Sequence, residues 1–290
     1  MFFNENDLLE IRINQHWNYV DKFFILEAGE THSGLKKPFN FDHQRFEKYR
    51  SKIVYKTIES FSIINHAENA FFVDRDFLST KHDNQKDTNT WLRESFQRNY
   101  ILKYLAEYSI NDDDIVMFMD LDEICSSGLL ASLPSLFDGK SRVCTSDITK
   151  QLINADPIIG IECHHLIYKL NLLKGKIHAG PITTFRNTCR IKPSTIRSFA
   201  IFSSKIKNSG WHFSFLDSES GSKVLEKYKS WGHSNQTDLE KKYCDLENAQ
   251  EALSRLERDF KISQCSTLED LELPKWLINN KDKYLNFFKQ

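Results

Sequence analysis

Two aspartates separated by one residue, Asp120 and Asp122, stand directly after the apolar run Ile115-Val116-Met117-Phe118. Such a run is typical of a buried strand, and open α/β sheets bind ligands beyond the carboxyl ends of their strands. Carboxylate oxygens are the ligands that Mg²⁺ and Mn²⁺ prefer, and the bound ion can neutralise the charge of a departing diphosphate. A solvated acidic turn would contain the same residue types, but the position after a buried strand favours a divalent metal site.

A denser acidic run, Asp112-Asp113-Asp114, lies before the same strand. It would sit at the amino end of that strand, away from the edge at which ligands bind. We therefore interpret it as a solvated turn rather than as a metal site.

Three charged residues, Arg93, Glu94 and Arg98, share one face of a predicted helix. The opposite face carries a row of apolar residues at four-residue spacing, which consists of Leu92, Phe96, Tyr100, Tyr104 and Tyr108. Glu94 and Arg98 can form an ordinary ion pair on the helix surface. The two arginines could instead hold a phosphate group near the acidic site.

Histidines supply further candidate ligands. His212 lies in the segment Gly210-Trp211-His212-Phe213-Ser214, and His32 lies in a predicted loop after the first strand. A histidine beside aromatic residues is usually a packed core residue, but imidazole is also a good third ligand for an ion that carboxylates hold. Both interpretations stay open. His164 and His165 would alternate across a predicted strand, so at most one of them can face a site.

The stretch from Cys163 to Leu216 contains nine lysines and arginines and no acidic residue. In a chain whose charges otherwise balance, this asymmetry is consistent with a positive wall that holds a diphosphate or an anionic acceptor. A basic strip on the surface explains it equally well.

The whole-chain composition excludes several classes of protein. The 39 basic residues nearly balance the 40 acidic ones, which argues against a nucleic-acid partner or an anionic membrane surface. The six cysteines include no C-x-x-C pair, which argues against a structural zinc site. No apolar stretch reaches the length of a transmembrane segment. We therefore expect a cytoplasmic protein, peripheral at most to a membrane that carries a lipid-linked acceptor.

The hydrophobic patterns that surround these residues predict an α/β fold. The 290 residues suit one compact domain with a helical cover at the carboxyl end. Residues 27–38, which contain Gly29, Gly34 and Pro38, should form a loop at the carboxyl end of the first strand. The other predicted elements are a helix over residues 9–17, strands at 23–26, 53–55, 115–118, 158–161 and 165–170, and helices over 90–108, 239–260 and the segment after Leu273-Pro274.

Five segments in the same order resemble glycosyltransferase family 17, the family of the β-1,4-mannosyl-glycoprotein N-acetylglucosaminyltransferase. Five ordered segments are more specific than any single one, and the resemblance runs nearly from end to end. The known animal members carry a membrane anchor and act on glycoproteins, so their acceptor is not carried over to this chain. The five segments are residues 3–12, residues 20–34 with Thr31-His32-Ser33-Gly34, Met119-Asp120-Leu121-Asp122-Glu123, Gly210-Trp211-His212-Phe213-Ser214, and Leu273-Pro274-Lys275-Trp276-Leu277 with Asn280.

The resemblance implies a nucleotide-diphospho-sugar transferase fold of the GT-A type, with a single mixed sheet flanked by helices. It also implies a Mn²⁺ or Mg²⁺ ion, inversion at the anomeric carbon, a UDP-sugar donor such as UDP-N-acetylglucosamine, and a glycan acceptor. The residues that match the metal motif are Asp120 and Asp122, with His212 as a third ligand. The candidate residues for binding the donor are Glu27, Thr31, His32, Arg93, Glu94, Arg98, Asp120 and Trp211.

The base that would deprotonate the acceptor hydroxyl is the least defined part of the predicted site. An inverting displacement needs a carboxylate or an imidazole for this step. Asp217 and Glu219, just beyond the Gly210–Ser214 segment, are the candidates by position alone.

Residues 1–290 should form one domain, with a nucleotide-sugar half over 1–125, a half that completes the metal and acceptor sites over 126–235, and carboxyl-terminal helices over 236–290. A catalytically silent protein that binds sugar or nucleotide, and a metal-dependent nucleotidyl or phosphoryl transferase, remain alternatives on the same fold.

Overall fold

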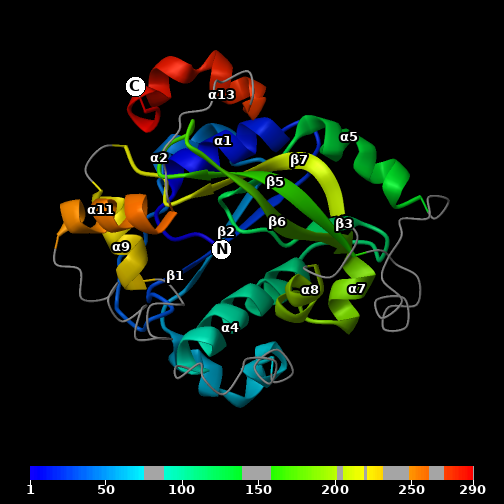
Figure 1. Ribbon diagram of the computed structural model, residues 1–290. Coiled ribbons are helices and arrows are strands. Elements are labelled where there is room, and N and C mark those ends of the chain that lie inside the picture. The colour runs from blue at the N-terminus through cyan, green and yellow to red at the C-terminus, as the bar shows by residue number, and fades with distance from the viewer. Residues whose placement is uncertain are drawn as a thin grey trace.

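The computed structural model describes residues 1–74, 88–138, 158–200, 205–218, 221–230, 248–260 and 271–289 (Figure 1). Helices and strands alternate through the first half of the chain, as the apolar patterns predict. The helices are α1 (Asn6–His16), α2 (His43–Phe46), α4 (Thr88–Leu105), α5 (Ser127–Leu136), α7 (Phe185–Arg190), α8 (Pro193–Ala200), α9 (Ser222–Ser230), α11 (Ala249–Phe260) and α13 (Lys275–Asn279). Short 3₁₀ helices are η1 (Glu47–Tyr49), η2 (Phe61–Asn65), η3 (Ala67–Phe72) and η4 (Lys281–Phe287).

The larger sheet has five strands in the order β3-β6-β5-β7-β4. β5 runs parallel to β7 and antiparallel to β6, whereas β3 and β4 pair antiparallel with β6 and β7. Pairing therefore makes β3, β5 and β7 parallel to one another, and their carboxyl ends point the same way. The strands are β3 (Ile115–Met117), β4 (Glu123–Cys125), β5 (Ile159–Ile167), β6 (Leu173–Thr184) and β7 (Lys205–Ser214).

A second, two-stranded parallel sheet consists of β1 (Phe23–Ala28) and β2 (Ile53–Ile58). The described strands therefore form two hydrogen-bonded sheets, where the sequence led us to expect one mixed sheet. β1 and β3 belong to different sheets and do not form hydrogen bonds with each other. Residues of both strands line a cavity of about 770 Å³. The side chains on this cavity, which include Phe23 and Val116, are largely apolar.

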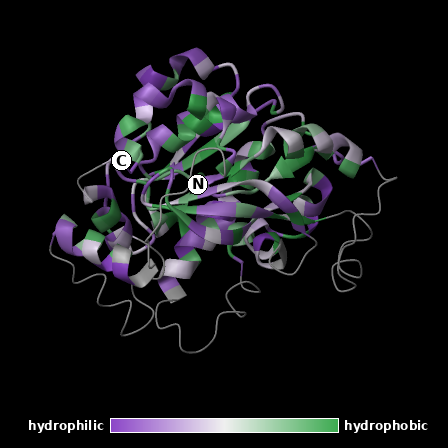
Figure 2. Ribbon diagram, turned by 45° about the horizontal axis from the view of Figure 1, so that its top comes forward, coloured by the Kyte–Doolittle hydropathy of each residue, from purple (hydrophilic) through white to green (hydrophobic). Residues whose placement is uncertain are grey.

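Helices cover both faces of the five-stranded sheet. α1, α5 and α13 lie on one side of it, and α4, α7 and α8 lie on the other (Figure 1). Apolar residues are concentrated in the central strands, whereas the outer faces of the helices are mostly polar (Figure 2). The largest core cluster joins α1, β1, β7 and the carboxyl-terminal helices, because Leu9, Ile25, Phe213 and Leu277 all pack into it. The chain end is thereby fixed against the first helix. No helix among the described residues is long and apolar enough to cross a membrane.

Most of the predicted elements of the first half are confirmed, including the helix over 90–108, which is α4. The strands predicted at 158–161 and 165–170 are one strand, β5. The sequence did not predict β6, because Lys174, Gly175, Gly180 and Pro181 within it are typical of a loop. Of the helix predicted over 239–260, α11 is the described part, and residues 231–247 lie outside the described residues.

Gly210 of β7 pairs with Cys125 of β4 and leaves no space for a side chain. A Cβ atom added there would lie 2.2 Å from the carbonyl oxygen of Ile124. We expect Gly210→Ala to lower the free energy of unfolding by about 1–3 kcal/mol, because the strands must separate to admit the methyl group. Urea unfolding measures this difference. The control is Gly128→Ala in α5, whose added Cβ meets nothing within 4 Å. Equal stability of the two variants would contradict the close packing at Gly210.

Candidate active site

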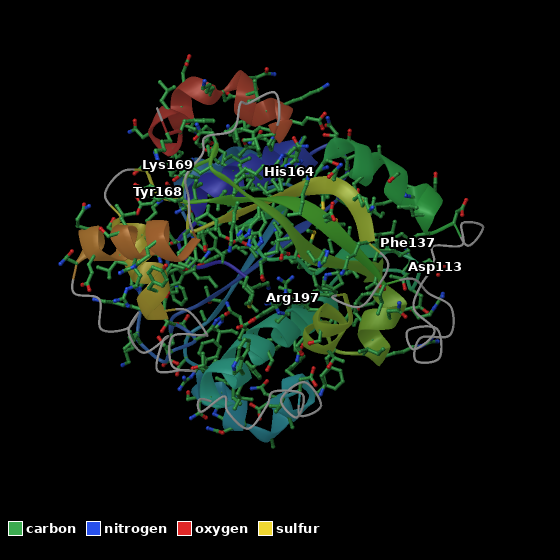
Figure 3. The ribbon with its side chains drawn as sticks, in the orientation of Figure 1. Asp113, Phe137, His164, Tyr168, Lys169 and Arg197 are labelled. Carbon is green, nitrogen blue, oxygen red and sulfur yellow. The ribbon has the colours of Figure 1, made fainter. Side chains whose placement is uncertain are left out.

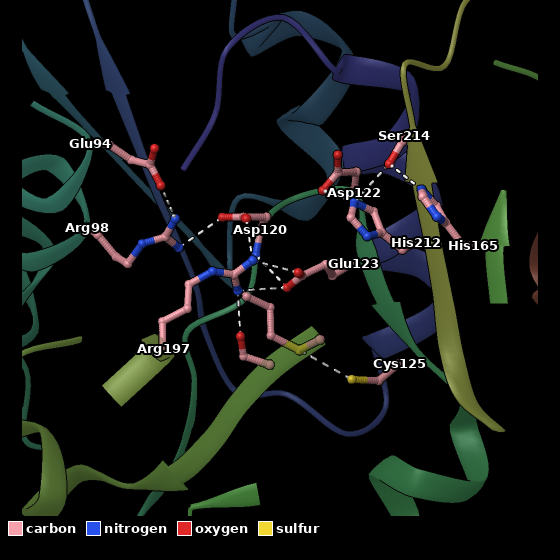
Figure 4. Close-up of polar contacts among 12 residues, drawn as sticks. Glu94, Arg98, Asp120, Asp122, Glu123, Cys125, His165, Arg197, His212 and Ser214 are labelled. Atoms are coloured by element: carbon pink, nitrogen blue, oxygen red, sulfur yellow. Dashed lines mark hydrogen bonds and ion pairs between the residues drawn. The ribbon is translucent and has the colours of Figure 1, made fainter. Parts of the chain in front are cut away.

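The turn between β3 and β4 brings three carboxylates together (Figure 4). Asp120 follows β3, Asp122 precedes β4, and Glu123 is the first residue of β4. Two arginines hold the Asp120 carboxylate: Arg98 of α4 binds Oδ1 at 2.9 Å, and Arg197 of α8 binds Oδ2 at 2.6 Å. This turn is therefore a balanced cluster of charges rather than a solvated acidic loop.

Arg197 was predicted only as one of the basic residues of the acid-free stretch, yet it contacts both Asp120 and Glu123 of this cluster. It binds Glu123 through both guanidinium nitrogens, at 2.7 and 3.1 Å, and also donates to the carbonyl oxygen of Gly180. Figure 3 shows Arg197 near the centre of the molecule, between the sheet and α4. The Glu123 side chain is 1% exposed, and Arg197 is its ion-pair partner among the described residues. The acid-free stretch from Cys163 to Leu216 was the only sequence signal for Arg197.

A second group of polar residues lies on β5 and β7 beside Asp122. His212 pairs across β7 and β4 with Glu123, and its Nε2 lies 3.5 Å from Asp122 Oδ1. Ser214 Oγ lies 3.1 Å from His212 Nε2 and 3.0 Å from His165 Nε2, and the two imidazole rings stack at 5.2 Å. A continuous polar row therefore runs from Asp122 to His165 (Figure 4).

The pKa values of this group follow from burial and charge. Burial would raise the pKa of Asp120, but Arg197 and Arg98 outweigh it, and the pKa lies well below its usual range. Burial would also raise the pKa of Asp122, but Lys227 and His212 lower it further than burial raises it. Burial would lower the pKa of His212, but the Asp122 carboxylate raises it instead. Burial lowers the pKa of His165 to about 4. At neutral pH both aspartates are therefore ionised and His165 is neutral.

The residues around Asp122 fit a divalent ion in part. A carboxylate oxygen and an imidazole nitrogen suit Mn²⁺ or Mg²⁺, and the buried Nδ1 of His212 has no hydrogen-bond partner among the described residues. The Asp120 carboxylate, in contrast, is held by two guanidinium groups. Across the described part of the chain, no three acidic, histidine or cysteine side chains lie at the spacing of one ion. The structure thus brings Asp122 and His212 together but leaves Asp120 with the arginines.

α4 links this cluster to the loop after β1. Glu94 pairs with Arg98 at 3.2 Å, and Arg93 donates to the carbonyl oxygen of His32 at 3.0 Å. His32 Nε2 lies 2.8 Å from the side-chain oxygen of Gln97, and burial lowers the pKa of His32. The predicted residues of the loop and of the helix are therefore neighbours, and Arg98 connects them to Asp120.

Three of the residues predicted to bind the donor make contacts within the protein, and their role toward a donor stays a prediction. Glu27 is fully buried. Its carboxylate accepts hydrogen bonds from the side chains of Lys37 and Tyr55 and from the backbone N–H groups of Asn40 and Phe41, so it holds the loop in place. Thr31 Oγ1 accepts from the backbone N–H of Leu35 within a turn. Trp211 faces the core opposite His212, and its indole N–H donates to Leu271. Strand alternation explains why Trp211 and His212 differ, because neighbours on β7 point to opposite faces.

Asp217 does not face the acidic cluster as a base would. Its side chain is buried, and Oδ2 accepts from the backbone N–H groups of Lys223 and Val224 at the start of α9. Asp217 therefore caps this helix. Glu219, the second candidate base, lies outside the described residues.

The cap predicts how substitutions of Asp217 behave. Asp217→Ala should lower the free energy of unfolding by about 0.5–2 kcal/mol, because two backbone donors lose their acceptor. Asp217→Asn should retain turnover, because asparagine caps a helix about as well. Thermal unfolding and an activity assay on both variants check this expectation. A stable but inactive Asp217→Asn protein would restore the role of base.

The basic residues of the acid-free stretch do not form one wall. Lys169 is buried and donates to backbone carbonyls at Asp217 and Asn286. Arg186 pairs with Asp112 and Asp113 at the amino end of β3. The acidic run that contains Asp112 and Asp113 is therefore an exposed turn whose charges pair with Arg186, and the sequence had predicted a solvated turn there. Among the described cations of the stretch, Arg197 alone pairs with the acidic cluster.

Comparison with known proteins gives one match. The sequence model of glycosyltransferase family 17 matches residues 1–145, which is half of the 290-residue chain. The matched part contains α4 and the turn with Asp120 and Asp122, whereas Arg197 and His212 lie beyond it. No curated protein and no solved structure matches the chain.

Proposed function

Because this chain belongs to glycosyltransferase family 17, we propose that it transfers N-acetylglucosamine from UDP-N-acetylglucosamine to a glycan acceptor, with inversion at the anomeric carbon. The family supports glycosyl transfer in general. The choice of donor, the inversion and the dependence on a metal are the further steps of this proposal. We also assign the mixed sheet, its flanking helices and the acidic turn after β3 to a fold of the GT-A type.

One observation carries the proposal: Asp122 stands at the end of the β3–β4 turn with His212 beside it, 3.5 Å from carboxylate to imidazole. Asp122 and His212, with Asp120 as the third predicted ligand, would hold Mn²⁺ or Mg²⁺. When bound, such an ion neutralises the charge that builds on a departing nucleoside diphosphate. The chain itself contributes the cations around the turn, which favour an anionic donor at this position.

The neighbouring residues position these ligands. Ser214 bridges His212 and neutral His165, so the His212 ring is oriented by a hydrogen bond and by stacking. Arg98 ties Asp120 to α4, and Arg93 and Gln97 of the same helix contact His32 of the loop after β1. We assign Arg93, Glu94, Arg98 and His32 to the donor side of the site because Arg98 pairs with both Asp120 and Glu94, and Arg93 of the same helix contacts His32.

The test is a panel of UDP-sugars incubated with the protein, with and without Mn²⁺, with the products identified by mass spectrometry. A glycosyltransferase slowly hydrolyses its donor to UDP and free sugar, and this reaction should require the ion. A nucleotidyl or phosphoryl transferase would release sugar phosphate instead. A silent binding protein would turn over none of the donors. Either of the last two results would replace the proposed function.

A further inference from the structure

Lys227 of α9 has one ion-pair partner among the described residues, the carboxylate of Asp122. Its Nζ lies 3.1 Å from Oδ2, and the side chain is 27% exposed. Lys227 also lies over the ring of Phe215, at 5.3 Å from its centre. The position of α9 is fixed independently, because Asp217 caps its start. Lys227 is thus a cation placed by the fold beside a predicted metal ligand.

The arginines of the cluster are held differently. If Arg197 lost its contact with Asp120, it would still bind the Glu123 carboxylate and the carbonyl oxygen of Gly180. Arg98 likewise keeps Glu94. Among the described residues, Lys227 has no second ion-pair partner of this kind. If another cation occupies the Asp122 carboxylate, Lys227 therefore loses its ion pair in a mostly buried position, which is unfavourable.

We propose that Lys227 is a ligand of the donor diphosphate, which it binds after exchanging Asp122 for the phosphate oxygens. This inference rests on the proposed function, because it takes the nucleotide-sugar donor and the divalent ion as given. The exchange keeps the charges of the site balanced, since an added divalent cation is matched by the anionic diphosphate. A lysine ammonium suits this role, because it binds phosphate as a compact charge on a flexible stem.

The inference predicts opposite effects on two affinities. In Lys227→Met, the affinity for UDP in the presence of Mn²⁺ should fall by roughly ten- to a hundredfold, because one charge-assisted contact to phosphate is lost. The affinity for Mn²⁺ without nucleotide should stay equal or rise, by up to about fivefold, because the competing ammonium is removed from Asp122. Calorimetry measures UDP binding, and electron paramagnetic resonance measures free Mn²⁺. Pyrophosphate serves as a probe of the diphosphate alone.

Lys223→Met is the matched control. Lys223 lies one turn earlier on α9 and pairs with Asp7 at 3.3 Å, outside the acidic turn. This variant should leave both affinities within about twofold of the wild type. Lys227→Arg, which keeps the charge, should retain most of the UDP affinity.

Two results would overturn the role of Lys227. One is a Lys227→Met protein that binds UDP and pyrophosphate as tightly as the wild type. The other is a parallel fall of the Mn²⁺ and UDP affinities together with a lower melting temperature, which would indicate a structural role. Failure of the proposed function gives a separate result, because the wild type would then release no free sugar from any UDP-sugar in Mn²⁺, whatever the UDP affinity of Lys227→Met.

Discussion

Asp122→Asn should lower Mn²⁺-dependent donor turnover by roughly a thousandfold or more, because a metal ion contributes several kcal/mol to stabilising a charged transition state. The substitution keeps the shape of the side chain and removes its charge. Lys227 and His212 both lose their carboxylate partner in mostly buried positions, with side chains that are 27% and 17% exposed. The melting temperature should therefore fall, so turnover is compared at a temperature at which both proteins are folded. The measurements are donor hydrolysis against Mn²⁺ concentration and thermal unfolding.

Asp113→Asn is the control for this variant. Asp113 is also an aspartate next to β3, but it pairs with Arg186 at the amino end of the strand, and its side chain is 82% exposed. Figure 3 shows it far from Arg197, towards the edge of the molecule. Turnover of Asp113→Asn should match the wild type. Equal activity of the Asp122→Asn and Asp113→Asn proteins would remove Asp122 from the metal site.

Arg197→Met should lower the free energy of unfolding by about 3–5 kcal/mol, the usual cost of leaving a buried charge without its partner. Glu123 is 1% exposed and takes both of its guanidinium contacts from Arg197, and the Asp120 carboxylate loses a contact as well. Urea unfolding measures the loss. Adding Glu123→Gln removes the stranded charge, so the double variant should be more stable than Arg197→Met alone.

Arg190→Met supplies the comparison for this stability effect. Arg190 ends α7 at an exposed position, and loss of its charge should change the free energy of unfolding by no more than about 0.5 kcal/mol. If Arg197→Met is as stable as Arg190→Met, the ion pair with Glu123 contributes nothing measurable to the fold. If the double variant is less stable than Arg197→Met, the instability does not arise from the stranded charge of Glu123.

The sequence alone determined the features that depend on neighbouring residues. The four-residue row from Leu92 to Tyr108 predicts α4, and an apolar run followed by two aspartates predicts a strand with acids at its carboxyl end. Alternation along a strand also predicted that His164 and His165 point to opposite faces. His165 indeed joins Ser214 and His212, whereas His164 contacts Lys176. Side chains return to the same face every two residues in a strand and every 3.6 residues in a helix. These periods follow from the backbone geometry alone, so they can be recognised in the sequence.

Only the tertiary structure decided which distant side chains meet. Arg197 lies 77 positions from Asp120, and Lys227 lies 105 positions from Asp122, and no local pattern links either pair. The packing of α8 and α9 beside the sheet brings them together. Packing likewise placed Glu27, a candidate donor-binding residue, in the anchor of a loop and Asp217, a candidate base, at the start of α9, because a buried carboxylate must bind the donors that surround it. Residue type and spacing predict which groups can do chemistry, whereas burial and partners determine which of them stay available for it.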